Sequence, residues 1–148
     1  MTVPQSIPGA EVNAPTTVSR VQSHSIADLL FRTLYLVFNP RTSFKTFPPW
    51  RSAAFAKRIL VACLSWPPAS VLRALELVEV LLNKEPRLEA LLSTDDRTGD
   101  GIYRGDLNDP QLCNAFASNF WELRMLESSH FEVTIRKQAG RLANYARK

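Results

Sequence analysis

Side chains that usually form enzyme and metal sites are scarce in this sequence. Its 148 residues include two cysteines and two histidines. Cys63 and Cys113 stand far apart without a CxxC pair, so we expect two reduced thiols and neither a zinc site nor a disulfide scaffold. His24 and His130 have no companion that would make a nucleophile–base arrangement. The sequence therefore predicts a protein that is not an enzyme and binds no metal, cofactor or small-molecule substrate.

Long apolar runs and phosphate-binding loops are missing too. Charged residues interrupt every apolar run before it reaches the roughly 18 residues of a membrane helix, so no membrane span is expected. Residues 1–17 lack the basic start and apolar centre of a secretory signal, which predicts an intracellular protein. Gly99, Gly101 and Gly105 follow no strand pattern and precede no lysine signature, so they predict no nucleotide site.

Helical periodicity accounts for most of what is present. Residues 1–18 are rich in proline, serine and threonine and are predicted to be a disordered tail, whereas residues 19–148 are predicted to form one domain. No useful alternating pattern indicates a strand. Apolar residues recur at three- and four-residue steps, which predicts helices over residues 25–38, 52–66, 69–84, 87–92 and 119–127, with a last helix after residue 129.

The helix over 52–66 and the helix over 69–84 are joined by a short proline-rich turn, which favours an antiparallel hairpin. The expected fold class is therefore all-α, with stacked helical hairpins similar to HEAT or armadillo repeats and a long acidic loop.

Apolar stripes predict which side of each helix faces the core. Ser25 and Asp28 form a capping box at the first helix. The stripe predicted to be buried there consists of Ile26, Leu29, Leu30, Thr33, Leu34 and Val37. In the helix over 52–66, Ser52 is the expected N-cap, and Lys57 is expected to point away from the core.

Two further capping boxes are predicted near the C-terminus. They pair Asn119 with Glu122 and Ser129 with Glu132. Trp121 follows the first of them and is predicted to be a buried aromatic residue. Its replacement by alanine is then expected to cost about 3–5 kcal/mol of stability.

Charge is distributed unevenly along the chain, whose net charge is +4. Residues 1–60 hold seven basic and two acidic groups, residues 61–132 hold six and twelve, and residues 133–148 hold five and none. This layout favours polyanions at the ends and a basic partner in the middle, although solvated faces of ordinary helices would produce it as well.

The acidic loop contains the candidate protein-binding residues. They are Asp95, Asp96, Tyr103, Asp106 and Asp109. Long loops in small helical domains are uncommon and often functional. The alternative is a solvated loop in which the aspartates stabilise local turns. A calcium loop is not expected, because Leu107 occupies the position at which a bidentate glutamate is required.

The last helix contains the candidate RNA-binding residues. They are Arg136, Lys137, Arg141, Arg147 and Lys148. Contacts of such side chains with phosphates would give sequence-independent, salt-sensitive binding. A solvated basic face is the alternative. No zinc, basic-zipper or recognition-helix signature indicates reading of DNA bases.

Four segments carry a family resemblance. They are RSAAFAKRIL (51–60), LRALELVEVLLNKEPRLEALLSTDDR (72–97), DGIYRGDLNDPQLCNAF (100–116) and FWEL (120–123). In this order they resemble the CCAAT-binding-factor domain of the nucleolar complex-associated proteins.

The resemblance implies a non-enzymatic helical scaffold of early large-subunit ribosome assembly in the nucleus and nucleolus. The implied partners are a second nucleolar complex protein, precursor large-subunit particles and ribosomal RNA. A chromatin-associated role in replication licensing or DNA binding is the alternative that the family suggests. Family members are several hundred residues long, so we expect this chain to be a fragment, a truncated sequence or a reduced relative.

Overall fold

The computed structural model describes residues 25–38, 47–93 and 101–145, and the regular structure in these ranges is helical throughout. The elements in chain order are α1 (Ile26–Phe38), α2 (Pro49–Cys63), α3 (Pro68–Lys84), η2 (Pro86–Leu92), η3 (Ala115–Ala117), α4 (Trp121–Ser129) and α5 (Val133–Ala143). The all-α prediction is confirmed, while the predicted tail over 1–18 lies outside the described residues. Within the described ranges, no helix combines the length and apolar character that crossing a bilayer requires.

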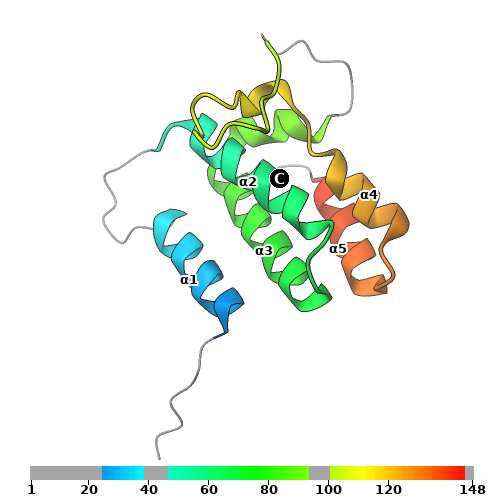
Figure 1. Ribbon diagram of the computed structural model, residues 1–148. Coiled ribbons are helices and arrows are strands. Elements are labelled where there is room, and N and C mark those ends of the chain that lie inside the picture. Colours follow the sequence, from blue (N-terminus) through cyan, green and yellow to red (C-terminus); the bar gives the residue numbers. More distant parts are fainter. Residues whose placement is uncertain (1–24, 39–46, 94–100, 146–148) are drawn as a thin grey trace, which may run out of the picture.

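The α2–α3 hairpin lies at the centre of the molecule, with its two helices antiparallel (Figure 1). Both helices begin with proline, at Pro49 and Pro68. Proline is well suited to these first-turn positions, because a backbone N–H there would have no partner within the helix. The expected N-cap at Ser52 is therefore wrong: Pro48 precedes the helix, and Ser52 is buried within it.

The α4–α5 hairpin packs beside the central hairpin on the side opposite α1 (Figure 1). Gly140 allows α5 to approach α4 closely, because a Cβ atom at this position would lie 2.7 Å from Glu127 Oε1. Leu123 and Leu126 of α4 and Ile135 and Leu142 of α5 are buried between the helices and α3.

Both capping boxes predicted for this hairpin are wrong. Asn119 Oδ1 does accept a hydrogen bond from the Trp121 amide at 3.2 Å, but Glu122 turns into the core instead of back to the cap. At α5, the N-cap Glu132 makes no side-chain cap bond, and its amide donates to His130 Nδ1 at 3.0 Å. His130 thus stabilises the connection between the two helices.

Helix α1 packs against α3 through a face that shares only Leu34 with the fully buried part of the predicted stripe. Its buried residues are Phe31, Leu34 and Phe38. The ring of Phe31 meets that of Trp66 edge-on at 5.9 Å, and the ring of Phe38 meets that of Phe55 at 5.4 Å. These aromatic pairs bury more area than aliphatic contacts would, so they decide which side of α1 faces the core.

Candidate interaction surfaces

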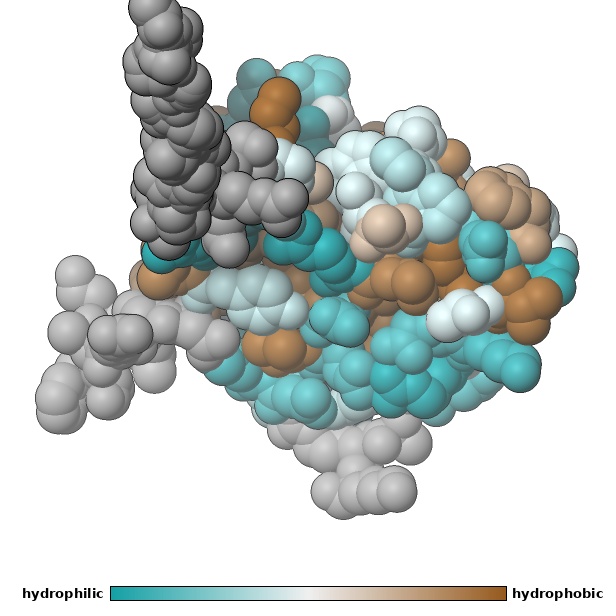
Figure 2. All heavy atoms as spheres, turned by 90° about the horizontal axis from the view of Figure 1, so that it is seen from below, coloured by the Kyte–Doolittle hydropathy of each residue, from teal (hydrophilic) through white to brown (hydrophobic). Residues whose placement is uncertain are grey.

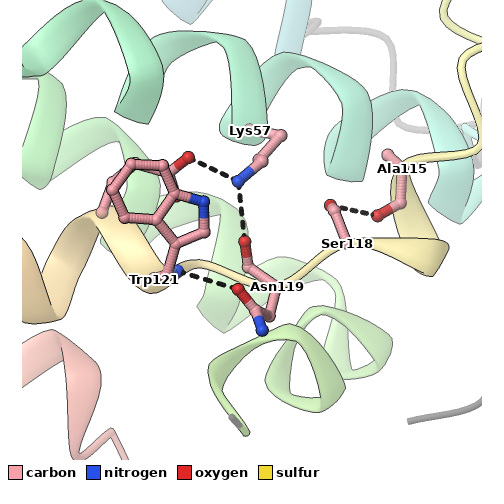
Figure 3. A network of polar contacts seen from close by, with 6 residues as sticks. Lys57, Ala115, Ser118, Asn119 and Trp121 are labelled. Atoms are coloured by element: carbon pink, nitrogen blue, oxygen red, sulfur yellow. Dashed lines mark hydrogen bonds and ion pairs between the residues drawn. The ribbon is translucent and has the colours of Figure 1, made fainter. Parts of the chain in front are cut away.

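A buried ion pair joins α2 to the start of α4. Lys57 Nζ donates hydrogen bonds to Glu122 Oε1 and, at 2.8 Å, to the Asn119 carbonyl oxygen (Figure 3). Both side chains are almost fully excluded from solvent. Glu122 Oε2 is buried without a hydrogen-bond partner in the described part of the chain. The negative charge of the Glu122 carboxylate therefore depends on Lys57 for its compensation.

Two aromatic rings flank this ion pair. Lys57 Nζ lies 5.3 Å from the centre of the Trp121 ring and 5.8 Å from that of Tyr103. Burial, together with the negative charge of Glu122, raises the pKa of the neighbouring Cys63 thiol to about 12. The expectation of a reduced Cys63 is met, because both cysteines are free and buried.

The prediction that Lys57 points away from the core is wrong. In the sequence, Lys57 stands at a helix position where an exposed basic residue is ordinary. Glu122 stands three residues after Asn119, where a capping-box glutamate is ordinary. Only the return of the chain through the segment 101–120 brings the two groups together, 65 residues apart in sequence. No local spacing signals such a contact. The contact between Lys57 and Glu122 attaches α4, and with it the α4–α5 hairpin, to the central hairpin.

Of the candidate protein-binding residues, the three that the structure describes contribute to the loop's own conformation. Asp106 forms an ion pair with Arg104 at 2.9 Å, and its hydrogen bond to that guanidinium lowers the pKa of the Asp106 carboxyl group. Asp109 Oδ1 accepts a hydrogen bond from the Gln111 amide at 2.8 Å. Tyr103 packs against the core, and burial raises its pKa. Asp95 and Asp96 lie outside the described residues.

The candidate RNA-binding residues of α5 fall into two groups. Arg141 is engaged by Glu79 of α3, with two guanidinium–carboxylate bonds of 2.7 and 2.8 Å. Arg136 and Lys137 make no side-chain polar contact with any described residue. They line a shallow depression of about 590 Å³ together with Glu127, Gly140, Arg141 and Asn144. Arg147 and Lys148 lie outside the described ranges.

The Glu79–Arg141 pair makes stability depend on pH. Its hydrogen bonds lower the pKa of the Glu79 carboxyl group below the ordinary 4.5. The pair's contribution is therefore complete above about pH 4.5 and is lost as the pH falls through the lowered pKa. Because the pair is partly exposed, we expect Glu79→Gln to remove no more than about 1 kcal/mol at pH 7, and this loss should shrink as the pH falls through the lowered pKa of the Glu79 carboxyl group. Urea denaturation at pH 7 and at a series of lower pH values checks this, and a loss that did not diminish in acid would contradict it.

Trp121 is 44% exposed, so the prediction of a buried tryptophan is wrong. The Lys57 ammonium group lies over its ring, and the side chain is otherwise partly open to solvent. We expect Trp121→Ala to lower the free energy of unfolding by about 1–2 kcal/mol, because only part of the ring's area is buried. Urea denaturation monitored by circular dichroism measures the change. A loss of about 4 kcal/mol would place the whole ring in the core.

Comparison with known proteins connects this arrangement to a family. Residues 16–139 match the profile of the CBF/Mak21 family, which covers α1 through most of α5. The chain belongs to the CBF/Mak21 family. The resemblance predicted from the four sequence segments is thereby confirmed.

The relatives of this CBF/Mak21 chain include proteins from animals and fungi. It is 30% identical over 123 residues to nucleolar complex protein 3 of Drosophila melanogaster, which covers 83% of this chain and 15% of the relative. It is 30% identical over 92 residues to nucleolar complex-associated protein 3 of Schizosaccharomyces pombe, covering 62% and 12%. A Xenopus laevis homologue is 36% identical over 83 residues, covering 56% and 10%. The chain thus spans a small part of the length of these relatives.

Proposed function

We propose that this chain acts as a non-enzymatic scaffold in the nucleolar assembly of the large ribosomal subunit. The observation that carries the proposal is the family match over residues 16–139, together with relatives named as nucleolar complex protein 3. Nuclear and nucleolar localisation follows from the same relatives. Precursor large-subunit particles and a second nucleolar complex protein are the partners proposed.

Ribosomal RNA is proposed to lie along α5. Arg136 and Lys137 are adjacent and form no ion pair with the described residues. They lie at a shallow depression open to solvent, whose one carboxylate, Glu127, is paired with Arg124. Phosphates would bind there with release of counterions, so the affinity would fall steeply with salt. Arg141 would contribute mainly by fixing α5 on α3 through Glu79.

The two hairpins suit a scaffold that continues as a helical repeat. The α2–α3 and α4–α5 hairpins pack side by side through α3 and α5. We propose that they are units of a HEAT- or armadillo-like stack, in which each hairpin buries its neighbour's apolar face.

Sedimentation tests the proposed function. The tagged chain, expressed in cells and separated on a sucrose gradient, should comigrate with precursor large subunits and shift to light fractions after ribonuclease treatment. Recovery only in light, RNA-free fractions before ribonuclease treatment would contradict the proposal.

A further inference from the structure

Helix α1 is apolar on two opposite sides, and one of them has no cover among the described residues. Phe31, Leu34 and Phe38 pack on the central hairpin. The other side exposes Ile26 to 87%, Leu29 to 52% and Leu36 to 63%, with Leu30 also exposed. Exposed apolar patches of this kind often mark the binding site of another protein. The open side of α1 is therefore a surface that a partner should cover.

The exposed residues follow the spacing of a helix–helix seam. Ile26, Leu29, Thr33 and Leu36 alternate at steps of three and four residues, as do the a and d positions of a heptad. Leu30 lies beside them at an e position and widens the stripe. Ile26, Leu29, Leu30 and Thr33 belong to the stripe that the sequence pattern predicted to be buried, and for them the prediction is wrong. Leu34 of that stripe is buried, and Leu36 was not part of it.

A groove continues the seam at the N-terminal end of α1. It has a volume of about 210 Å³ and lies between α1 and the turn that joins α2 to α3. Its apolar lining comes mainly from Ile26, Leu30, Phe31, Trp66 and Pro67. Figure 2 views this end of the molecule and shows apolar side chains exposed among polar ones. Such a groove would accept one large apolar side chain.

Two polar contacts fix α1 in place beneath this surface. Arg73 NH1 lies 2.6 Å from Asp28 Oδ1 at the N-terminal end, and Lys84 Nζ donates to the Phe38 carbonyl oxygen at 2.9 Å at the C-terminal end. The guanidinium of Arg73 also stacks on the Phe31 ring at 4.7 Å. The seam is thus held in position before a partner arrives, which reduces the entropy lost on binding.

Charge indicates what kind of helix fits. Arg32 occupies the g position beside the seam, is exposed, and makes no polar contact with the described residues. A partner helix with an acidic residue opposite Arg32 would compensate this charge. A second copy of the chain offers no carboxylate from its own seam, since Asp28 is held by Arg73 on the other side of α1. Two copies would also add their net charges of +4.

We propose that the open side of α1 binds one amphipathic helix of a partner protein, whose apolar residues fill the seam and groove and whose acidic residue pairs with Arg32. This deepens the proposed scaffold function by naming its protein-binding face, and rests on that function for the kind of assembly involved.

Photo-crosslinking tests this inference on the full chain in cells. A benzophenone amino acid replaces Leu29 or Leu36, or, as a control, Leu112, which is 62% exposed on the loop. The two α1 positions should crosslink to a single segment of one other polypeptide, at sites three, four or seven residues apart and next to an acidic residue. Crosslinks to this chain, to a second copy or to RNA, or yields no higher than at Leu112, would overturn the proposal.

Substitutions provide a second test with matched controls. L29Q/L36Q should lower the crosslinking yield from position 26 by about tenfold or more, whereas L112Q/M125Q should leave it unchanged. R32E should lower the yield and R32K should retain it. Melting temperatures of the purified variants should equal that of the parent, since all these side chains are exposed. Equal yields for the seam and control variants would contradict the assignment.

The gradient experiment separates this inference from the proposed function. A partner helix captured at α1 while the chain stays in light, RNA-free fractions would leave the docking surface intact and refute the ribosomal role. Comigration with precursor particles without the helical crosslinks would support the ribosomal role and refute the docking surface on α1.

Discussion

Replacing Lys57 with methionine is expected to lower the free energy of unfolding by about 3–5 kcal/mol, because it leaves the buried Glu122 carboxylate without a counter-charge. Urea denaturation at pH 7 measures the loss. An unchanged midpoint at pH 7 would show that the pair is solvated.

A double variant distinguishes charge compensation from packing. K57M/E122L removes both charges and should recover most of the stability that K57M loses. The control is Arg104→Met at the exposed pair with Asp106, which should cost less than about 1 kcal/mol. If K57M and the double variant were equally unstable, the loss would come from altered packing or lost hydrogen bonds and not from an unpaired charge.

Charge reversal on α5 is the second change with a large expected effect. R136E/K137E should lower the affinity for ribosomal RNA by about 10- to 100-fold at 0.1 M salt and reduce the slope of log affinity against log salt. Stability should be unchanged, since neither side chain has a polar partner among the described residues. Fluorescence anisotropy with a fragment of precursor ribosomal RNA measures the affinity.

R32E/R87E is the matched control for this prediction, because it makes the same change in net charge at exposed arginines away from α5. An equal loss of affinity in both variants would mean that RNA responds to overall charge and not to α5. Duplex DNA is the competitor of choice. DNA that displaced the RNA in a sequence-dependent way would favour the chromatin alternative.

The positions of the helices could be predicted from the sequence, because proline boundaries and apolar periodicity are local signals. Pro67–Pro68 and the stripe through Val71, Leu75 and Val78 set the central hairpin without reference to the rest of the chain. The orientation of α1 could not be predicted in this way. Both of its sides are apolar, and the choice between them depends on ring contacts with Phe55 and Trp66.

Contacts between distant segments explain the remaining differences at the candidate sites. Lys57 and Glu122 each match an ordinary local role, and only the tertiary fold brings them together. Arg141, Arg136 and Lys137 are indistinguishable as basic residues of one helix, yet Glu79 engages only the first of them. The sequence of a single helix contains no information about ion pairs that its side chains form with distant segments.

Ultraviolet crosslinking of the chain to RNA within isolated precursor large-subunit particles tests the central claim most directly, namely that α5 contacts ribosomal RNA while the open side of α1 is left for a protein. The expected result is RNA attached to peptides containing Arg136 or Lys137 and none on peptides from 26–38. RNA attached to α1 with α5 unmodified, or no RNA on the chain at all, would contradict it.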